Sequence, residues 1–181
     1  SGLAQVRFTL NPFAQDSAFR FLNSSDRAAV FLRTPAVMPP AREFDYNDLN
    51  AALVGLIVQR ATGRPWSEWL DQKIWRPMGG QRAEVWLDRE GEGATAMTAC
   101  CMLAPAMDWV RVGLLMKDRG LVRGVPVLPA GWIDAMITPS PAYPGYGYFT
   151  WLGQGMGDRQ LRPDDRERPQ TEAFLAPDIF M

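Results

Sequence analysis

The chain has 181 residues, of which 47% are hydrophobic, and its 19 basic and 20 acidic residues leave a net charge of −1. This balance offers no electrostatic surface for nucleic acid or acidic lipid, and no apolar run approaches the roughly 20 residues of a membrane span. Histidine is absent, which excludes a Ser-His-Asp triad, a Cys-His pair and a His-ligated metal within these residues.

A single domain accommodates this length, and the strongest helical pattern within it covers residues 48–62. Apolar side chains recur there at helical spacing, at Leu49, Leu53, Leu56 and Ile57. Either Asn47 or Asp48 can cap the first turn, because a short polar side chain accepts a hydrogen bond from an unpaired backbone N–H group. Gly63 follows at the position where a left-handed residue ends many helices.

Three further helices are predicted, and prolines mark where they begin. The segment "RPWSEWLDQKIWRPMGG" indicates a helix with Pro65 near its first turn and Pro77 at its end. The segment "APAMDWVRVGLLMKDRG" indicates a helix that starts at Pro105 and stops before Gly120. "LPAGWIDAMIT" repeats the proline-first pattern in a shorter helix.

Two segments show strand patterns. Residues 82–88 ("RAEVWLD") alternate between polar and apolar side chains, which indicates a short strand. Residues 145–153 ("GYGYFTWLG") indicate an aromatic strand whose glycines allow another element to pack closely. Residues 158–172 are charged and interrupted by prolines, so we expect a solvated, salt-bridged loop there rather than a metal site.

The sequence contains no recognisable activated nucleophile. It has no GxSxG, P-loop, GxGxxG or HExxH motif, and neither lysine begins a K-[ST]-G. An S-x-x-K motif is missing as well, since Ser17 and Ser24 are followed three residues later by arginine and Ser67 by leucine. The only cysteines, Cys100 and Cys101, are adjacent and lack CxxC spacing, so we expect them to be small buried residues.

Several modest motifs occur in an order that resembles the serine β-lactamase and penicillin-binding-protein superfamily. In that superfamily a Y-x-N-type motif opens a helix that ends in "TG". The segment "FDYNDLNAALVGLIVQRATG" of this chain shows the same order. A second helix then closes on a turn that "RPMGG" resembles, and "TACCMLAPAMDWVRVGLLMKDRG", "VPVLPAGW" and "YGYFTWLG" resemble the segments beyond it. Family VIII esterases and 6-aminohexanoate-dimer-type amide hydrolases resemble the chain more than dedicated antibiotic-resistance enzymes do.

The resemblance implies an α/β (α+β) fold of the β-lactamase/transpeptidase type, with a helical subdomain and part of the antiparallel sheet. It places residues 1–181 in the central part of a single domain with both ends truncated, since the initial "SGL" resembles a segment downstream of the nucleophile. Expected partners are a small-molecule ester or amide substrate, and the remainder of the domain or a second copy of the chain. We expect no nucleic-acid partner, no membrane span and no cofactor. The sequence does not indicate the cellular compartment.

By this resemblance, Tyr46 is the catalytic tyrosine of the Y-x-N-type motif. A free phenol has a pKa of about 10, so acting as a base near pH 7 needs roughly 3–4 kcal/mol of differential stabilisation. Alternatively, Tyr46 stays neutral and passes a proton to the leaving group as an acid. A tyrosine that merely packs at the start of a helix is the structural alternative to both roles.

Substrate binding is expected from Asn47 and Asp48, and from Tyr148 and Trp151 unless these two belong to the core. Class C β-lactamases have asparagine as the third residue of Y-x-N, where this chain has Asp48. A carboxylate only accepts hydrogen bonds, so donation to an amide carbonyl is lost. This departure argues against a β-lactam specialist and is compatible with an esterase, a small-amide hydrolase, or Asp48 as a simple helix cap.

The reaction implied for the parent protein is acyl transfer, in which a serine attacks an ester or amide and the resulting acyl-enzyme is hydrolysed. The 181-residue chain alone lacks the nucleophile and is expected to be inactive. The alternative is a non-catalytic binding or regulatory protein that kept the fold and lost the nucleophile.

Overall fold

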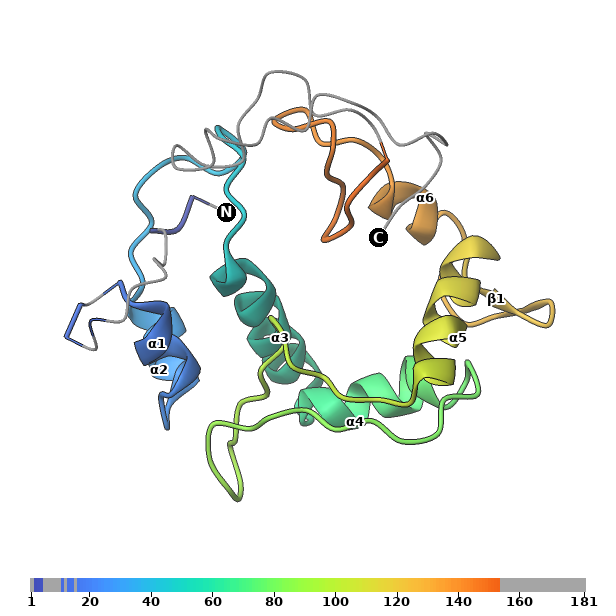
Figure 1. Cartoon of the computed structure of the whole chain (residues 1–181), viewed down its shortest axis with the longest axis horizontal. Coiled ribbons are helices and arrows are strands. Elements are labelled where there is room, and N and C mark those ends of the chain that lie inside the picture. The colour runs from blue at the N-terminus through green and yellow to red at the C-terminus, as the bar shows by residue number, and fades with distance from the viewer. Residues whose placement is uncertain (1, 5–10, 12, 15, 154–181) are drawn as a thin grey trace.

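The computed structural model describes residues 2–4, 11, 13, 14 and 16–153. Its helices are α1 (Ala18–Leu22), α2 (Arg27–Arg33), α3 (Asp48–Thr62), α4 (Trp66–Leu70), the π-helix η1 (Asp71–Trp75), α5 (Ala106–Lys117) and α6 (Trp132–Met136). A hairpin of β1 (Leu121–Val122) and β2 (Val125–Pro126) lies between α5 and α6. Figure 1 shows the helices following one another around the molecule, with α1 and α2 beside α3.

The structure confirms the helix predicted at residues 48–62, which is α3. Asn47 is its N-cap, because the Asn47 side chain accepts a hydrogen bond of 3.0 Å from the backbone N–H of Leu49. Gly63 ends the helix in a left-handed conformation, with φ 65°. Asp48 is the first helical residue, where its negative charge is favourable beside the positive end of the helix dipole.

The proline-first helices also form, with two differences from the prediction. Pro65 and Pro105 occupy the N-cap positions of α4 and α5. The first difference is that α4 continues into the π-helix η1, which carries the buried Trp75. The second is that α6 begins only after Gly131, whose left-handed φ of 76° cannot belong to a right-handed helix.

The two predicted strands are wrong, because neither segment forms a strand ladder among the described residues. Isolated bridges between described residues occur instead, at Glu84–Leu103 and Leu87–Ala96 in the first segment and at Tyr146–Trp151 in the second. The ladder that the described residues do contain joins β1 and β2 in antiparallel register.

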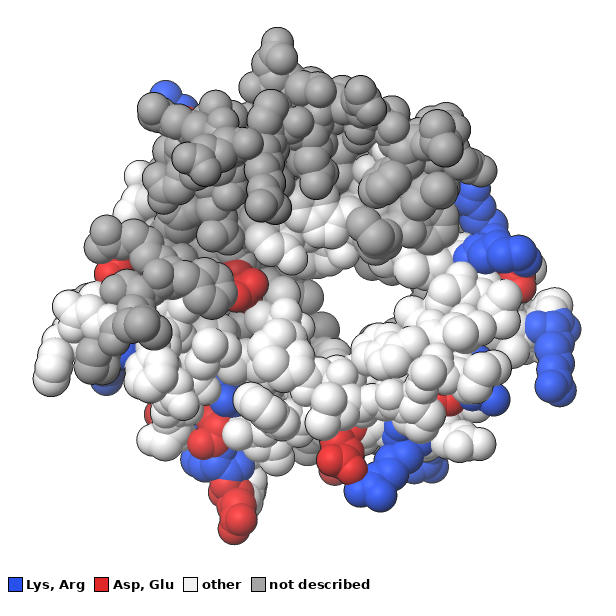
Figure 2. Space-filling view, in the orientation of Figure 1, with Lys and Arg blue, Asp and Glu red and all other residues white. Residues whose placement is uncertain are grey.

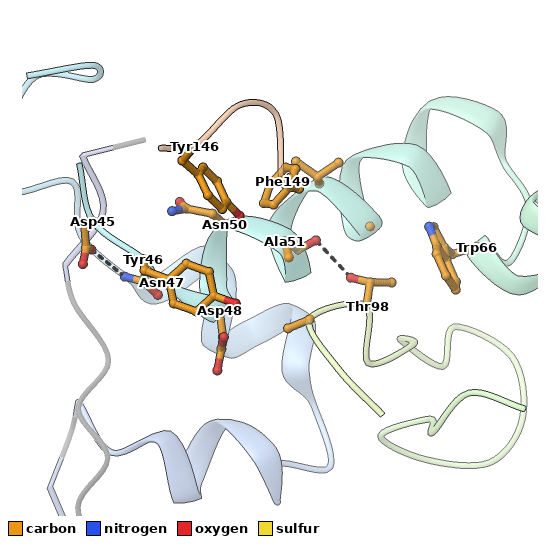
Figure 3. A pocket seen from close by; sticks show the side chains of 13 residues that line it. Asp45, Tyr46, Asn47, Asp48, Asn50, Ala51, Trp66, Thr98, Tyr146 and Phe149 are labelled. Carbon is orange, nitrogen blue, oxygen red and sulfur yellow. Dashed lines mark hydrogen bonds between the residues drawn. The ribbon is translucent and has the colours of Figure 1, made fainter. Parts of the chain in front are cut away.

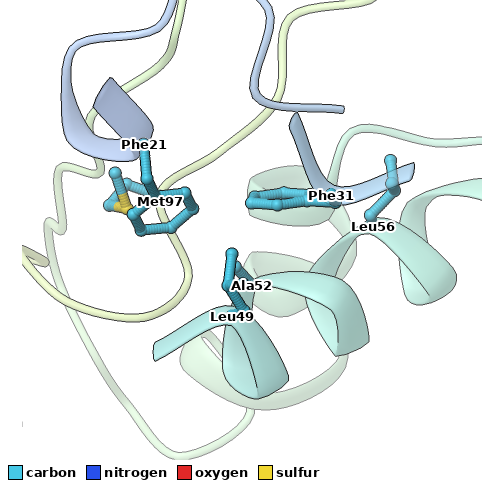
Figure 4. Close-up of a cluster of buried hydrophobic side chains, with 6 residues drawn as sticks. All are labelled: Phe21, Phe31, Leu49, Ala52, Leu56 and Met97. Atoms are coloured by element: carbon cyan, nitrogen blue, oxygen red, sulfur yellow. The ribbon is translucent and has the colours of Figure 1, made fainter. Parts of the chain in front are cut away.

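Two apolar clusters form the core of the part of the chain that the structure describes. The larger joins α1 and α2 to α3 (Figure 4) and consists of Phe21, Phe31, Leu49, Ala52, Leu56 and Met97. Met97 reaches this cluster from a loop and is only 1% exposed, so the chain just before Thr98 is fixed against α3. The smaller cluster packs η1 and the turn after it against α5 and consists of Trp75, Met78 and Leu115.

A buried polar link holds the loop that leads to Met97. The backbone N–H of Arg27 donates to one carboxylate oxygen of Asp88 at 2.9 Å, and the other oxygen accepts from the N–H of Thr95 at 2.7 Å. The Arg27 guanidinium donates to the carbonyl oxygens of Thr95, at 3.4 Å, and Leu22, at 3.0 Å. Burial lowers the pKa of Arg27 and the Asp88 charge opposes that shift, and the Arg27 guanidinium stays protonated.

On the face shown in Figure 2, charged side chains are scattered along the rim, and uncharged side chains border an opening near the middle. None of the helices in the described residues combines the length and the apolar character that a bilayer span requires. The described residues also contain no group of three or more Cys, Asp or Glu side chains that could hold a metal ion, and residues 158–172 lie outside them.

Candidate functional site

The chain enters α3 through a polar turn that Asn47 holds in place. The Asn47 amide nitrogen donates to a carboxylate oxygen of Asp45 at 3.2 Å and to the carbonyl oxygen of Ala4 at 3.3 Å. Its amide oxygen caps the helix, so both ends of the amide are engaged. These bonds fix the backbone from which the neighbouring side chains of Tyr46 and Asp48 project.

The Tyr46 ring packs in an aromatic cluster with the turn that follows α6. Its centroid lies 5.3 Å from that of Trp151 and 6.0 Å from that of Tyr146, whose plane is nearly perpendicular at 88°. Phe44 stacks on Tyr143 at 4.4 Å within the same cluster. Aromatic pairs of this kind contribute about 0.5–1.5 kcal/mol beyond their buried area. The Tyr46 ring is therefore held in place even though 40% of its surface is exposed.

Tyr46 and Tyr146 of this cluster border a cavity of about 360 Å³ at the N-terminal end of α3 (Figure 3). Figure 3 shows the phenol groups of Tyr46 and Tyr146 turned toward the middle of the cavity. Two carboxylates and several apolar side chains also line it, and none of the described lining residues is lysine or arginine (the carboxylates are Asp45 and Asp48). A largely apolar cavity with a few convergent polar groups is the usual form of a small-molecule site.

Thr98 forms the wall of the cavity that faces α3. Its hydroxyl group donates to the carbonyl oxygen of Ala51 at 3.0 Å. This approach requires glycine at position 55, because a Cβ atom on Gly55 would lie 2.3 Å from the Thr98 hydroxyl oxygen. The preceding residue, Met97, donates its N–H to the carbonyl oxygen of Trp86 at 2.8 Å, so the wall is anchored on both sides.

The turn after α6 brings Tyr146 to the cavity and Trp151 to the Tyr46 ring. Phe149 adopts a left-handed φ of 51°, which reverses the chain where the sequence pattern predicts a continuing strand. Gly147 packs against the end of α6, where a Cβ atom would lie 1.9 Å from the carbonyl oxygen of Met136. The prediction that a glycine here allows close packing is therefore confirmed.

The structure brings four of the five residues predicted for the site together and places the fifth elsewhere. Tyr46, Asn47 and Asp48 line the cavity, and Trp151 contacts the Tyr46 ring. Tyr148 is 61% exposed and lines a neighbouring cavity of about 410 Å³ instead. Since the chain reverses at the next residue, Tyr148 lies on the outer side of the turn.

Tyr146 is a neutral hydrogen-bonding group at any physiological pH. Burial raises the pKa of Tyr146 to about 12, and the neighbouring Tyr46 contributes in the same direction. The like-charge effect means that an ionised Tyr46 makes ionisation of Tyr146 harder, so the two phenols do not readily carry charge together. Burial also raises the pKa of Tyr143 in the same cluster.

Several lining residues were not identified from the sequence. Asn50, Ala51 and Val54 face the cavity from α3, at helical spacing from Asn47, so the helical period could have shown them. Trp66, Thr98 and Phe149 come from other segments, and no local sequence pattern links them to Tyr46.

Cys100 and Cys101 form a disulfide with each other, so the prediction of two small buried residues is wrong. Cys100 is exposed, and Cys101 is half-buried with a left-handed φ of 71°. The disulfide therefore leaves no free thiol among the described residues.

The hydroxyl groups that line the cavity belong to Tyr46, Tyr146 and Thr98, and the Thr98 hydroxyl group already donates to a backbone carbonyl oxygen. The described cavity thus supplies proton donors and acceptors rather than an activated nucleophile.

The helical fold is that of the β-lactamase/transpeptidase-like hydrolases. The β-lactamase family model matches residues 2–157, which is most of the chain, and the chain therefore belongs to the β-lactamase family. This match confirms both the resemblance drawn from the motifs and the fold class that it implied.

Individual relatives agree with this assignment. The 6-aminohexanoate-dimer hydrolase of Paenarthrobacter ureafaciens is 31% identical over 129 residues, which are 70% of this chain and 32% of that protein. A solved structure of SurE with D-Leu is 27% identical, with a TM-score of 0.55 over 75% of this chain and 37% of SurE. A penicillin binding protein from Bacillus halodurans shares the fold at 16% identity, with a TM-score of 0.53 over 72% of this chain and 47% of that one. The chain spans about a third of the length of the curated relative.

Proposed function

We propose that the chain forms the tyrosine side of the active site of a serine hydrolase that cleaves an ester or a small amide through an acyl-enzyme. The observation that carries this proposal is the Tyr46 phenol, which lines a cavity of about 360 Å³ and is held there by Trp151 and Tyr146. Membership of the β-lactamase family and similarity to 6-aminohexanoate-dimer hydrolase support it.

Tyr46 acts as the proton carrier in this proposal. When the serine oxygen bonds to the substrate carbonyl carbon, the serine loses its proton, and the departing alcohol or amine must gain one. The chain has no histidine to perform that transfer. A phenol at the cavity wall can donate its proton to the leaving group and recover one from the serine or from the incoming water.

The acidic lining favours substrates that donate hydrogen bonds. Asp45 and Asp48 line the cavity, and ionised carboxylates accept hydrogen bonds but cannot donate them to a carbonyl oxygen. A small amide with an N–H group, or an ester with a hydroxyl or amino group nearby, matches these acceptors. A β-lactam ring offers its carbonyl oxygen to a donor, which Asp48 does not supply when ionised.

The nucleophile is proposed to come from polypeptide outside these 181 residues. The sequence has no S-x-x-K motif, and the described lining of the cavity contains no serine or lysine. The isolated chain is accordingly expected to be hydrolytically silent. The same absence supports the second candidate, a binding or regulatory protein that has lost the nucleophile.

Two measurements test the proposal. The isolated chain is incubated with p-nitrophenyl butyrate and with a fluorophosphonate probe, and neither hydrolysis nor covalent labelling is expected. Labelling of a serine within these residues would show that the nucleophile assignment is wrong. The gene-encoded polypeptide that contains the chain is then assayed in the same way; labelling of an S-x-x-K serine supports the hydrolase, and a silent polypeptide without that motif supports the binding protein.

A further inference from the structure

A second cavity, of about 290 Å³, lies between the starts of α4 and α5. Trp66 and Trp109 face it from the two helices, and the Cys100–Cys101 disulfide lies in the loop that lines it. We propose that this cavity is an apolar subsite, which takes an aliphatic or aromatic group of the substrate whose carbonyl lies beside Tyr46. The subsite rests on the proposed function, because it extends that active site.

The lining of this cavity leaves little for a polar group to bind. None of its described lining side chains is charged, and the one hydroxyl group belongs to Thr98. That hydroxyl already donates to the carbonyl oxygen of Ala51. The joined sulfurs of Cys100 and Cys101 have no S–H group to donate, and sulfur makes favourable contacts with aromatic rings. An apolar group is therefore the occupant that this cavity favours, because it gives up no hydrogen bonds to water when it enters.

The two cavities are continuous along one wall. Trp66, Thr98 and Ala99 line both of them. A ligand that places its carbonyl group between Tyr46 and Thr98 can thus extend past Trp66 into the second cavity without leaving the protein surface.

The disulfide stiffens the part of this wall that backbone hydrogen bonds do not hold. The segment is anchored before the disulfide, where the N–H of Met97 donates to Trp86 at 2.8 Å, and after it, where the N–H of Leu103 donates to Glu84 at 2.8 Å. Among the described residues, no backbone hydrogen bond involves positions 99–102. Ala99 and Cys101 pack against the larger core cluster and Met102 packs against the smaller one, so the disulfide adds a covalent restraint to a segment that side-chain packing already holds, which preorganises the subsite.

The proposal predicts how affinity changes with the length of the acyl chain. Each methylene group that leaves water for an apolar cavity raises affinity about fourfold. Dissociation constants of butyramide, hexanamide and phenylacetamide are measured by ligand-observed NMR titration of the isolated chain, without reductant. We expect hexanamide to bind roughly fifteenfold more tightly than butyramide, since two more methylene groups are buried. Equal affinities would overturn the subsite.

Two variants locate the effect. Trp109→Ala removes one wall and should reduce the preference for hexanamide to less than about threefold, with butyramide binding unchanged. Trp132→Ala is the matched control, because Trp132 is similarly exposed (48%, against 44% for Trp109) and lies on α6, away from the cavity. It should keep the parental preference. A preference that is unchanged in Trp109→Ala, or equally reduced in Trp132→Ala, argues against the subsite.

A second substitution covers the possibility that Trp109→Ala unfolds, since the Trp109 ring contacts the buried Trp75 at 6.0 Å. The double variant Cys100→Ser, Cys101→Ser replaces the disulfide with two hydroxyl groups and should also lower the preference for hexanamide.

Failure of the subsite and failure of the proposed function remain distinguishable. Hydrolysis by the parent protein without dependence on acyl length rejects only the subsite, and length-dependent binding by a parent protein that hydrolyses nothing rejects only the hydrolase.

Discussion

The rings of Tyr46 and Trp151 lie 5.3 Å apart between centroids, although one residue leads into α3 and the other belongs to the turn after α6. Tyr46 therefore has two separable parts, a ring that packs and a hydroxyl group that faces the cavity. Removing the hydroxyl group alone tests the chemistry without disturbing the packing.

The first prediction is that Tyr46→Phe, made in the hydrolase that we propose contains this chain, lowers kcat while leaving stability almost unchanged. Proton transfer by a positioned side chain is typically worth about 10²–10⁴ in rate. The loss should appear in kcat rather than in KM, because the transfer stabilises the transition state and not the bound substrate. Steady-state kinetics and a thermal melt measure the two quantities.

Tyr148→Phe is the comparison for this experiment, since Tyr148 lines the neighbouring cavity. It should change kcat by less than about threefold, well below the effect of losing a proton carrier. If Tyr46→Phe retained more than about a third of the parental kcat with the same pH profile, Tyr46 would be a packing residue. Comparable losses in both variants would show that neither hydroxyl group has a specific catalytic role.

The second prediction concerns substrate preference. Asp48→Asn replaces a side chain that only accepts hydrogen bonds with one that also donates. Asparagine keeps an acceptor oxygen for the N–H group of an amide and adds a donor for the carbonyl oxygen, so we expect kcat/KM for small amides to rise relative to that for esters, while ester turnover changes little. The ratio of kcat/KM for a matched amide and ester pair measures the effect. An equal fall for both substrates would show that Asp48 supports α3 rather than substrate selection, since it lies in the first turn of the helix.

The third prediction is a loss of stability at high pH that depends on Tyr146. A tyrosine in the unfolded chain releases its proton near pH 10, whereas burial holds the pKa of Tyr146 at about 12 in the folded protein. Between these values the folded state binds more protons than the unfolded state, so the free energy of unfolding falls as the pH rises. The contribution is fully present below about pH 10.

Urea denaturation between pH 9 and 12, with tyrosinate absorbance followed in parallel, measures this dependence. Tyr146→Phe should make the decline shallower, because the phenol responsible is gone. Tyr148→Phe should retain the parental decline, since that side chain is exposed. Identical curves for the parent and Tyr146→Phe would show that this phenol is not buried in solution.

The fourth prediction tests the wall formed by Thr98. Gly55→Ala should destabilise the chain by about 1–3 kcal/mol, because the added Cβ atom would lie 2.3 Å from the Thr98 hydroxyl oxygen and 2.8 Å from the Thr98 Cβ atom. Gly113→Ala on α5 is the matched control, since no atom lies within 4 Å of its added Cβ. That change should stabilise the chain by up to about 1 kcal/mol, owing to the higher helix propensity of alanine. Chemical denaturation compares the two, and equal effects would mean that Thr98 does not pack on α3.

The sequence predicts the long helices well because their ends carry chemical signals. Asn47 and Gly63 mark the two ends of α3. Pro105 marks the start of α5 in the same way. The short helix α2 was missed although Asp26 caps it by accepting a hydrogen bond from Ala29, so a signal was present there. Helix α1 has no side-chain cap, and its five residues are too few to show a period.

The two predicted strands failed for a different reason. Alternation between polar and apolar residues shows that a segment is extended, but a strand also needs a partner over several consecutive residues. Residues 82–88 find such partners only at isolated bridges. In the other segment the left-handed φ of Phe149 ends the strand pattern, and phenylalanine gives no sequence signal for that conformation.

In the candidate site, too, residues that are adjacent in the sequence could be predicted and residues brought together by the tertiary fold could not. Tyr46, Asn47 and Asp48 are contiguous, so a sequence motif was enough to bring them together. Trp151 and Tyr148 were predicted from one strand, and the reversal at Phe149 sends them to different places. Thr98 reaches α3 only through tertiary contacts, which a local pattern cannot encode.

The bond between Cys100 and Cys101 has a practical consequence. Because the chain's two cysteines are used by each other, any cysteine added by mutation becomes its single reactive thiol. Tyr148→Cys would place that thiol on the exposed turn beside the cavity, where a maleimide dye can be attached without replacing a native cysteine. The emission of such a dye would report ligand entry and motion of the turn directly, in a protein that is otherwise unlabelled.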